Sequence, residues 1–407
     1  MLQKIKNFVK KETVLTIAVL LAVISAFFVK PGREYLTYID WRTLCILLSL
    51  MLVVAGFQRN GLFDAIGRKL LARTRNTAQL VGVLVFLCFF SSMLITNDVA
   101  LLTFVPFALV TLQKCNQQRL IVLVFVLQTI AANLGSMLTP IGNPQNLYLY
   151  GLAGVDAGEF MSWMLPYTAF SGLLLLVVVF VLSARRQKLS PEDCAYETPE
   201  DCAYETPEDC VHETPGDCAY ETPEEEVHES RKKNVVYKKN AVYLVLFVLS
   251  LLVVARLIPC YAVLAVILVT VFFVDRAVFG EVDYCLLLTF IAFFIFIGNM
   301  GNLPAVRDTL QSLVCGRELG IGIAASQIVS NVPAALLLSG FTSDYKSLTL
   351  GVNFGGLGTL IASMASLISY KIYAHNYNKT KGIYLLCFTI ANLLFLAALV
   401  LLYVFAS

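Results

Sequence analysis

The sequence predicts an all-α polytopic membrane protein with inverted-topology repeats, re-entrant hairpins and broken transmembrane helices. Three observations predict this class: a very apolar composition, long apolar runs, and polar interruptions at corresponding positions of two halves of the chain. Of the 407 residues, 58% are hydrophobic and only 14% are charged, whereas soluble proteins carry roughly 25% charged residues. This leaves too little polar surface to cover a water-soluble globule.

Apolar runs long enough to cross a bilayer recur along the whole chain. The clearest ones occupy residues 13–29, 39–57, 160–183, 257–274, 283–300 and 383–405. The first run follows several lysines between Lys4 and Lys11, so a cleaved signal peptide is an alternative. Because no small-x-small cleavage site follows this run before Lys30, we favour a retained transmembrane helix.

The segment between Ser190 and Ser230 repeats EDCAYETP with a period of eight and holds fifteen acidic residues but no Lys or Arg. It cannot bury enough apolar surface to offset the entropy of ordering, so we expect a disordered linker. Metal capture by its Cys, Asp, Glu and His side chains is an alternative, but its thiols lack the short Cys-x-x-Cys spacing typical of zinc sites. The predicted organisation is a first transmembrane repeat (1–183), the acidic linker (184–240), and a linking helix with a second, inverted repeat (241–407).

The distribution of charge predicts the orientation of the helices. Outside the acidic segment the chain has thirteen acidic residues and all thirty of its Lys and Arg residues. Cytoplasmic loops usually carry the excess of Lys and Arg. This rule places the N-terminus and the acidic loop in the cytoplasm of a cell-membrane protein. The helix at 39–57 then runs inward, a linking helix near 241–255 crosses outward, and the helix at 283–300 runs outward. Such inverted repeats are typical of secondary transporters.

The two halves share features in the same order. Asp40-Trp41 and Asp283-Tyr284 each open an apolar run, and an amphipathic segment follows each run, at 60–76 and 302–318. Further on, NLGSMLTPIGNPQNLYLY (133–150) aligns without gaps on NFGGLGTLIASMASLISY (353–370). We therefore expect interfacial helices after the spans at 39–57 and 283–300, and one broken helix in each half.

Polar breaks interrupt the apolar segments at 96–98, 133–146, 330–333 and 353–366. In hydrocarbon, a break is tolerated only where protein buries it or where it lines a wet cavity. Half-helix N-termini offer N–H donors to an anion, and freed carbonyls suit a cation. The alternative is that these residues only join helices and allow close packing. Because the breaks correspond between the halves, we predict a substrate and ion site near the bilayer midplane, formed by Thr96, Asn97, Asp98, Thr139, Gly142, Asn143, Asn146, Ser330, Asn331, Thr359 and Ser363.

Asp98 is the most informative of these residues. A charge at the bilayer centre is costly, so an intramembrane carboxylate is a functional candidate by default. It has no acidic counterpart in the second half, where Val332 follows Asn331. Asp98 could bind Na⁺, together with Asn97 and Asn331, or carry a proton. The structural alternative is a helix N-cap at the tip of a hairpin.

The tip motifs ITNDVALL and VSNVPAALL are followed by the breaks GSMLTPIGNPQNL and GGLGTLIASMASL. These motifs resemble the ion transporter superfamily, which includes arsenite permeases, citrate and dicarboxylate symporters, and certain sodium–proton antiporters. The resemblance covers both halves. It implies an elevator-like transporter whose mobile domain carries both hairpins, with Asn97, Ser330 and Asn331 binding sodium and carboxylate. The first tip departs from the Ser-Asn-Thr pattern of dicarboxylate carriers at Thr96 and Asp98, and the second tip departs from it at Val332. The Thr-Asn-Asp tip is closer to the arsenite-permease type.

The sequence therefore predicts a secondary active transporter that moves a small anion, such as a carboxylate or arsenite, with Na⁺ or H⁺ as coupling ion. A sodium–proton antiporter is the alternative within the superfamily. A channel or an intramembrane enzyme would be another class; the chain has only three His, and no His-Glu-x-x-His motif. The expected partners are the anion, the coupling cation and the lipid bilayer, with a homodimer as one candidate assembly. No cofactor, structural metal or nucleic acid is expected.

Overall fold

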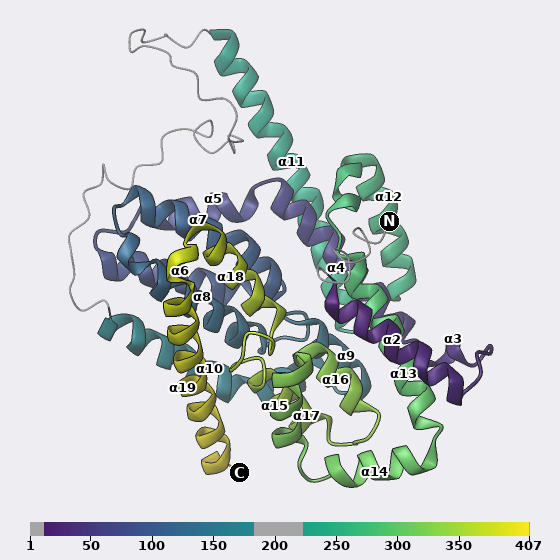
Figure 1. Ribbon diagram of the computed structural model, residues 1–407. Coiled ribbons are helices and arrows are strands. Elements are labelled where there is room, and N and C mark those ends of the chain that lie inside the picture. The colour runs from purple at the N-terminus through teal and green to yellow at the C-terminus, as the bar shows by residue number, and fades with distance from the viewer. Residues whose placement is uncertain (1–11, 183–222, 407) are drawn as a thin grey trace.

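The computed structural model describes residues 12–182 and 223–406, and all regular structure in these residues is helical (Figure 1). The first half contains α2 (Thr13–Phe28), α3 (Tyr35–Tyr38), α4 (Trp41–Arg59), α5 (Leu62–Leu71), α6 (Thr77–Ser91), α7 (Asn97–Lys114), α8 (Ile121–Ser136), α9 (Pro144–Ala153) and α10 (Ala157–Leu182). The second half contains α12 (Cys260–Val274), α13 (Tyr284–Gly301), α14 (Pro304–Val314), α15 (Glu318–Val329), α16 (Asn331–Ser339), α17 (Tyr345–Phe354), α18 (Met364–Asn376) and α19 (Lys381–Ala406). Helix α11 (Pro223–Val254) joins the two halves.

Six helices in the described ranges are long and apolar enough to cross a membrane. All six apolar runs predicted from the sequence form helices, with ends that agree to within three residues. Four of these helices, α4, α10, α13 and α19, are among the six long enough to cross a membrane, whereas α2 and α12 are apolar but shorter. The other two spanning helices lie at Gln118–Ser136 and Val235–Val254. The chain is therefore an all-α, multi-pass membrane protein, as predicted.

Three predicted segments differ from the structure. The amphipathic segment predicted at 302–318 forms the shorter α14, which ends at Val314 before Gly316 with its left-handed φ of 76°. The amphipathic segment predicted at 60–76 forms a shorter helix, α5, because Asn76 already caps the next helix by accepting from Gln79 N at 2.9 Å. The predicted disordered linker extended to residue 240, but α11 begins at Pro223, so residues 223–240 are helical. After Pro223 this stretch contains no further proline and is rich in Glu and Lys, which favour helices. The remainder of the linker lies outside the described residues.

The two halves are interlocked in a reciprocal way. Helices α6 and α7 form the first hairpin, and α15 and α16 form the second. The first arm of each hairpin packs on the broken helix of its own half, α6 on α8 and α15 on α17. The second arm also packs on the broken helix of the other half, α7 on α18 and α16 on α9. The site predicted at the breaks therefore lies where the two repeats meet.

The ends of α4 and α13 show that the repeats are inverted. Arg59, the last residue of α4, forms ion pairs with Asp275 at 3.0 Å and with Glu281 at 2.7 Å. Glu281 lies just before α13 begins, so α4 ends on the side where α13 starts. The two helices also begin alike, because the Asp40 and Asp283 carboxylates each accept a backbone N–H at 3.0 Å. Both carboxylates act as N-caps.

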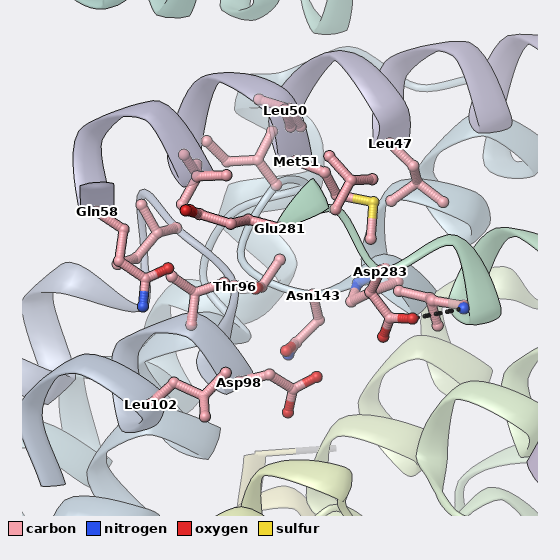
Figure 2. Close-up of a pocket in the computed structure, with 18 of the residues that line it drawn as sticks. Leu47, Leu50, Met51, Gln58, Thr96, Asp98, Leu102, Asn143, Glu281 and Asp283 are labelled. Atoms are coloured by element: carbon pink, nitrogen blue, oxygen red, sulfur yellow. Dashed lines mark hydrogen bonds between the residues drawn. The ribbon is translucent and has the colours of Figure 1, made fainter. Parts of the chain in front are cut away.

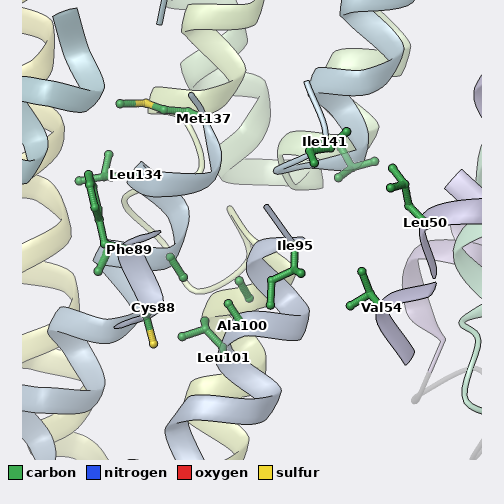
Figure 3. Close-up of a cluster of buried hydrophobic side chains, with 14 of the residues drawn as sticks. Leu50, Val54, Cys88, Phe89, Ile95, Ala100, Leu101, Leu134, Met137 and Ile141 are labelled. Atoms are coloured by element: carbon green, nitrogen blue, oxygen red, sulfur yellow. The ribbon is translucent and has the colours of Figure 1, made fainter. Parts of the chain in front are cut away.

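Close packing of hairpin on broken helix depends on glycine in both halves. A Cβ atom at Gly135 would lie 2.6 Å from Ser92 Oγ, and one at Gly355 would lie 2.6 Å from Ser326 Oγ. Figure 3 shows the apolar side chains around the first contact, including Phe89 of α6 and Leu134 of α8. Glycine at these positions lets the hairpin backbone approach the helix, as small residues do in membrane proteins generally.

Candidate ion and substrate site

Each hairpin tip is hydrogen-bonded to the break of its own half. Asn97 N donates to Gly142 O at 3.2 Å, and Asn331 N donates to Ala362 O at 2.9 Å. Gly142 and Ala362 occupy the same position in the two aligned breaks. In each tip the asparagine Oδ1 also accepts from the backbone N–H of the following residue, at 2.9 Å and 3.0 Å. The side chain thus satisfies one of the free backbone N–H groups in the first turn of the helix that leaves the tip.

Two threonines of the predicted set fasten the breaks to the hairpins. Thr139 Oγ1 donates to Met93 O at 2.5 Å, and Thr359 Oγ1 donates to Gln327 O at 3.2 Å. These contacts correspond between the halves. Both hydroxyl donors are used on backbone carbonyls, and Thr139 Oγ1 also accepts from Gly142 N at 3.1 Å. The two threonines and Gly142 therefore shape the breaks.

Asn133, at the end of α8, connects the first tip with the second break. Its Oδ1 accepts from Asn97 Nδ2 and from Ser363 Oγ, both at 2.9 Å. Its Nδ2 lies 3.4 Å from Gly356 O and 3.5 Å from Ser366 Oγ. Gly356 in turn lies beside the second tip, because a Cβ atom on it would meet Asn331 Nδ2 at 3.0 Å. Asn133 thus bridges residues of both repeats.

Asn353, at the end of α17, makes the reciprocal contacts. Its Nδ2 donates to Asn146 Oδ1 at 2.7 Å, and its Oδ1 accepts from Asn143 Nδ2 at 3.4 Å. The sequence prediction selected Asn143 and Asn146 but missed both Asn133 and Asn353. Identical residues at the first position of the two aligned breaks were the signal that could have found them.

These side chains form a buried, uncharged network, which we call the amide network. Its members are at most 4% exposed. They are Asn97, Asn133, Ser136, Asn143, Asn146, Ser330, Asn331, Asn353, Ser363 and Ser366. The network offers amide and hydroxyl donors as well as carbonyl acceptors, and can therefore hold a polar solute without introducing a fixed charge.

Amide side chains also donate hydrogen bonds to backbone carbonyls that have no helical partner at the breaks. Asn146 Nδ2 lies 3.2, 3.3 and 3.2 Å from three carbonyl oxygens at the end of α8 and in the following turn. In the second half, Gln327 Nε2 donates to two carbonyl oxygens of the break at 2.8 and 2.9 Å. Because backbone groups in hydrocarbon must be satisfied internally, these amides stabilise the broken helices.

The two tips differ in backbone conformation. Ser330 has φ 76° and ψ 156°, whereas Thr96 at the equivalent place has φ −64° and ψ 150°. The conformation of Ser330 is nearly restricted to glycine, and such strain costs on the order of 1–3 kcal/mol. Strained residues of this kind concentrate at ligand sites.

A cavity of about 190 Å³ lies beside the amide network, between the first tip, the first break, α4, α18 and the loop before α13. Thr96, Asp98 and Asn143 of the predicted set line it, together with Glu281 and Asp283 (Figure 2). The Asp98 carboxylate forms no hydrogen bond or ion pair with another described residue. Asp98 lies in the first turn of α7, where the helix dipole favours a negative charge.

The predicted site residues fall into two groups. Asn97, Asn143, Asn146, Ser330, Asn331 and Ser363 belong to the amide network. Thr96 and Asp98 lie in the adjoining cavity, which Asn143 also reaches, while the remaining residues hold the breaks in place. The structure thus brings residues of both repeats together at one place.

Interlocked inverted repeats with spanning helices and paired polar tips define a membrane transporter. Residues 4–343 match the model of the family described as "Citrate transporter", and the chain belongs to this family. An uncharacterized transporter of Methanocaldococcus jannaschii is 30% identical over 375 residues, covering 90% of each chain. The inner membrane protein YbiR of Escherichia coli is 29% identical over 368 residues, covering 87% of this chain and 86% of its own. A Dictyostelium discoideum protein named "Putative transporter arsB" is 24% identical over 129 residues, which is 31% of this chain and 22% of its own.

Proposed function

We propose that this protein is a secondary active transporter that moves a small carboxylate or an inorganic oxyanion such as arsenite across the cell membrane. The family description supports a carboxylate. The Thr-Asn-Asp tip, which resembles the arsenite-permease type, supports an oxyanion. The observation that carries the proposal is the amide network, in which both tips and both breaks contribute buried polar groups. Its N–H and O–H donors suit an anion whose charge a coupling cation balances.

The proposed transport cycle is elevator-like. The hairpins and broken helices form the moving unit, and α4 and α13 with their partners form the scaffold. This division is supported by the packing, because α2 lies against α13 and α11 and α12 lie against α4. The positive-inside rule supports a cytoplasmic N-terminus and a cytoplasmic acidic loop. The cavity near Gln58 and Glu281 would then open toward the cytoplasm.

Uptake into proteoliposomes tests the proposal. Citrate, succinate, phosphate and arsenite are offered with and without an inward Na⁺ gradient, and separately with a pH gradient. We expect gradient-driven accumulation of at least one of these anions. Asn97→Ala and Asn331→Ala should each abolish it while the protein still inserts into the membrane. Full activity of either variant would remove the proposed site.

A sodium–proton antiporter is the second candidate, and the acidic cavity favours it. Asp98 is an intramembrane carboxylate without an ion-pair partner among the described residues, and antiporters move protons and Na⁺ over such groups. In this case Asp98→Asn should abolish Na⁺-driven pH changes in vesicles. In an anion carrier the same variant should instead alter the Na⁺ or pH dependence of anion uptake.

A further inference from the structure

A groove lies between α6 and α10, and none of its lining residues belongs to the amide network or to the cavity beside it. Its volume is about 500 Å³, which is within the range of small-ligand pockets. Phe180 of α10 is 61% exposed and Leu176 is 55% exposed. Because α10 is a membrane-spanning helix, these exposed apolar side chains face hydrocarbon. The apolar lining consists of Gly82, Phe86, Leu176, Val177, Val179 and Phe180.

Gly82 leaves the space between the two helices open. A Cβ atom on Gly82 would meet only a methyl group of Val179, at 3.8 Å. Phe86 lines the groove one turn further along α6, and its ring packs against Phe89 and Phe90 with centroid distances of 5.8 and 5.9 Å. From Gln79 to Phe86 the groove follows α6 for about 10 Å. This long, apolar shape suits part of an extended acyl chain.

The other end of the groove is polar and lies where α6 begins and α10 ends. Asn76 and Gln79 line this end. Asn76 Oδ1 accepts from Gln79 N at 2.9 Å, and Gln79 Oε1 accepts from Arg75 N at 2.8 Å. Both amide oxygens are thus engaged, whereas Asn76 Nδ2 and Gln79 Nε2 have no hydrogen-bond partner in the described part of the chain. Two N–H donors are therefore available to an anion.

Two arginines add positive charge at the polar end. Arg75 directly precedes Asn76, and its backbone bond to Gln79 holds it beside the groove. Arg73 lies two residues earlier. Both side chains are exposed, and neither forms an ion pair with another described residue. The positive-inside rule assigns this loop to the cytoplasmic side, and the cytoplasmic leaflet carries the anionic lipids.

We propose that an anionic phospholipid of the cytoplasmic leaflet binds in this groove, with an acyl chain between α6 and α10 and its phosphate at Arg75, Asn76 and Gln79. A guanidinium binds phosphate oxygens through two parallel hydrogen bonds, which favours arginine at such a place. A second copy of the chain fits less well. In a two-fold dimer the same patch would face itself, and Arg73 and Arg75 of both copies would then repel each other.

A lipid in the groove contacts two helices that support the first hairpin. α6 is the first arm of that hairpin, and α6 and α10 both pack on the broken helix α8. The lipid therefore stabilises the association of α6 with α10. Its binding uses no residue that we assign to the transported solute, so the lipid site goes beyond the proposed transport function and is tested separately from it.

The test measures lipid binding to the purified full-length protein in an uncharged detergent, without a transport assay. Thermal unfolding is followed while dioleoyl phosphatidylglycerol, which is anionic, is added to the micelles. Zwitterionic dioleoyl phosphatidylcholine, dioleoylglycerol and inorganic phosphate form separate series. Ligands that bind only the folded protein raise its unfolding temperature.

Two variants alter the two ends of the groove. Gly82→Leu fills its apolar part, and Arg75→Gln removes a charge but keeps the backbone bond to Gln79. Gly82→Ala and Lys381→Gln are the matched controls, because alanine adds a single methyl group and Lys381 is an exposed base at the start of α19, outside the groove. Should Gly82→Leu fail to insert into the membrane, Val177→Trp fills the groove from the exposed side of α10.

We expect phosphatidylglycerol to stabilise the wild type and both controls at a lower mole fraction than phosphatidylcholine does. In Arg75→Gln the mole fraction of phosphatidylglycerol for half-maximal stabilisation should rise about tenfold, because a hydrogen bond between charged groups is lost. The filled groove of Gly82→Leu should abolish the preference for phosphatidylglycerol.

Four results would overturn the lipid site. The first is an equal response of the wild type to the two phospholipids, and the second is an unchanged response in the variant that fills the groove. The third is full stabilisation by inorganic phosphate or by dioleoylglycerol alone, which would mean that one half of the site suffices. The fourth is a change of oligomeric mass in Gly82→Leu with an unchanged lipid response, which would identify the groove as a subunit interface.

Discussion

Asn133 joins the two repeats, since its Oδ1 accepts from Asn97 of its own repeat and from Ser363 of the other, both at 2.9 Å. We expect Asn133→Ala to abolish transport and to lower the free energy of unfolding by about 1–3 kcal/mol, because two buried donors lose their acceptor. Uptake and thermal unfolding measure these effects. Asn392→Ala is the control, because Asn392 is an equally buried asparagine of α19 that bonds only within its helix. A transport-competent Asn133→Ala would contradict a role for the amide network.

Ser330 offers a second test at the level of single residues. Because its φ of 76° suits glycine, Ser330→Gly should be more stable than Ser330→Ala by about 1 kcal/mol. Both variants lack the hydroxyl, so both should transport poorly if Ser330 Oγ contacts the solute. Unfolding temperatures and uptake are compared for the pair. Equal stability of the two variants would mean that the tip is not strained.

At the level of elements, the contact between each hairpin and its broken helix depends on glycine. Gly135→Ala would press Cβ against Phe89 O and Ser92 Oγ, and Gly355→Ala would press it against Ser326. Each variant should lose about 1–3 kcal/mol of stability through overpacking. Gly82→Ala is the control, because its Cβ would meet only a methyl group at 3.8 Å. Unfolding temperatures measure the difference, and similar values for all three variants would refute close packing at the breaks.

Helices as elements were largely predictable, because apolar runs longer than a bilayer's thickness must fold as helices. The positions of the breaks were also predictable, since Pro140, Gly142 and Pro144 interrupt a helix. The beginning of α11 at Pro223 was not predicted. The first part of α11 is charged, so its composition assigned it to the linker. A helix that continues a membrane span needs no apolar face of its own, and the sequence therefore carried no helical pattern there.

At the level of the whole molecule, the elevator proposal requires the first hairpin to move relative to α4. Met51 of α4 and Leu102 of α7 line the same cavity from opposite units (Figure 2). A bifunctional thiol reagent that links Met51→Cys to Leu102→Cys should stop uptake, and a reducible reagent should allow its recovery. Linking the neighbouring native Cys45 and Cys260, both of which lie in scaffold helices, should leave uptake unchanged. Full activity of the linked Met51→Cys/Leu102→Cys protein would contradict the elevator movement.

The sequence by itself determined the membrane class, the spans, the inverted repeats and the four breaks, because hydrophobicity and helix-breaking residues act locally. Only the tertiary structure decided how the breaks are used. In the folded chain, Thr139 and Thr359 donate to backbone carbonyls. Asn133 and Asn353 form hydrogen bonds with residues of the opposite repeat. The tertiary structure also brought Asp283 to the cavity of Asp98 across nearly two hundred residues of sequence. Such pairings depend on how two distant segments pack, and no local pattern in either segment specifies its partner.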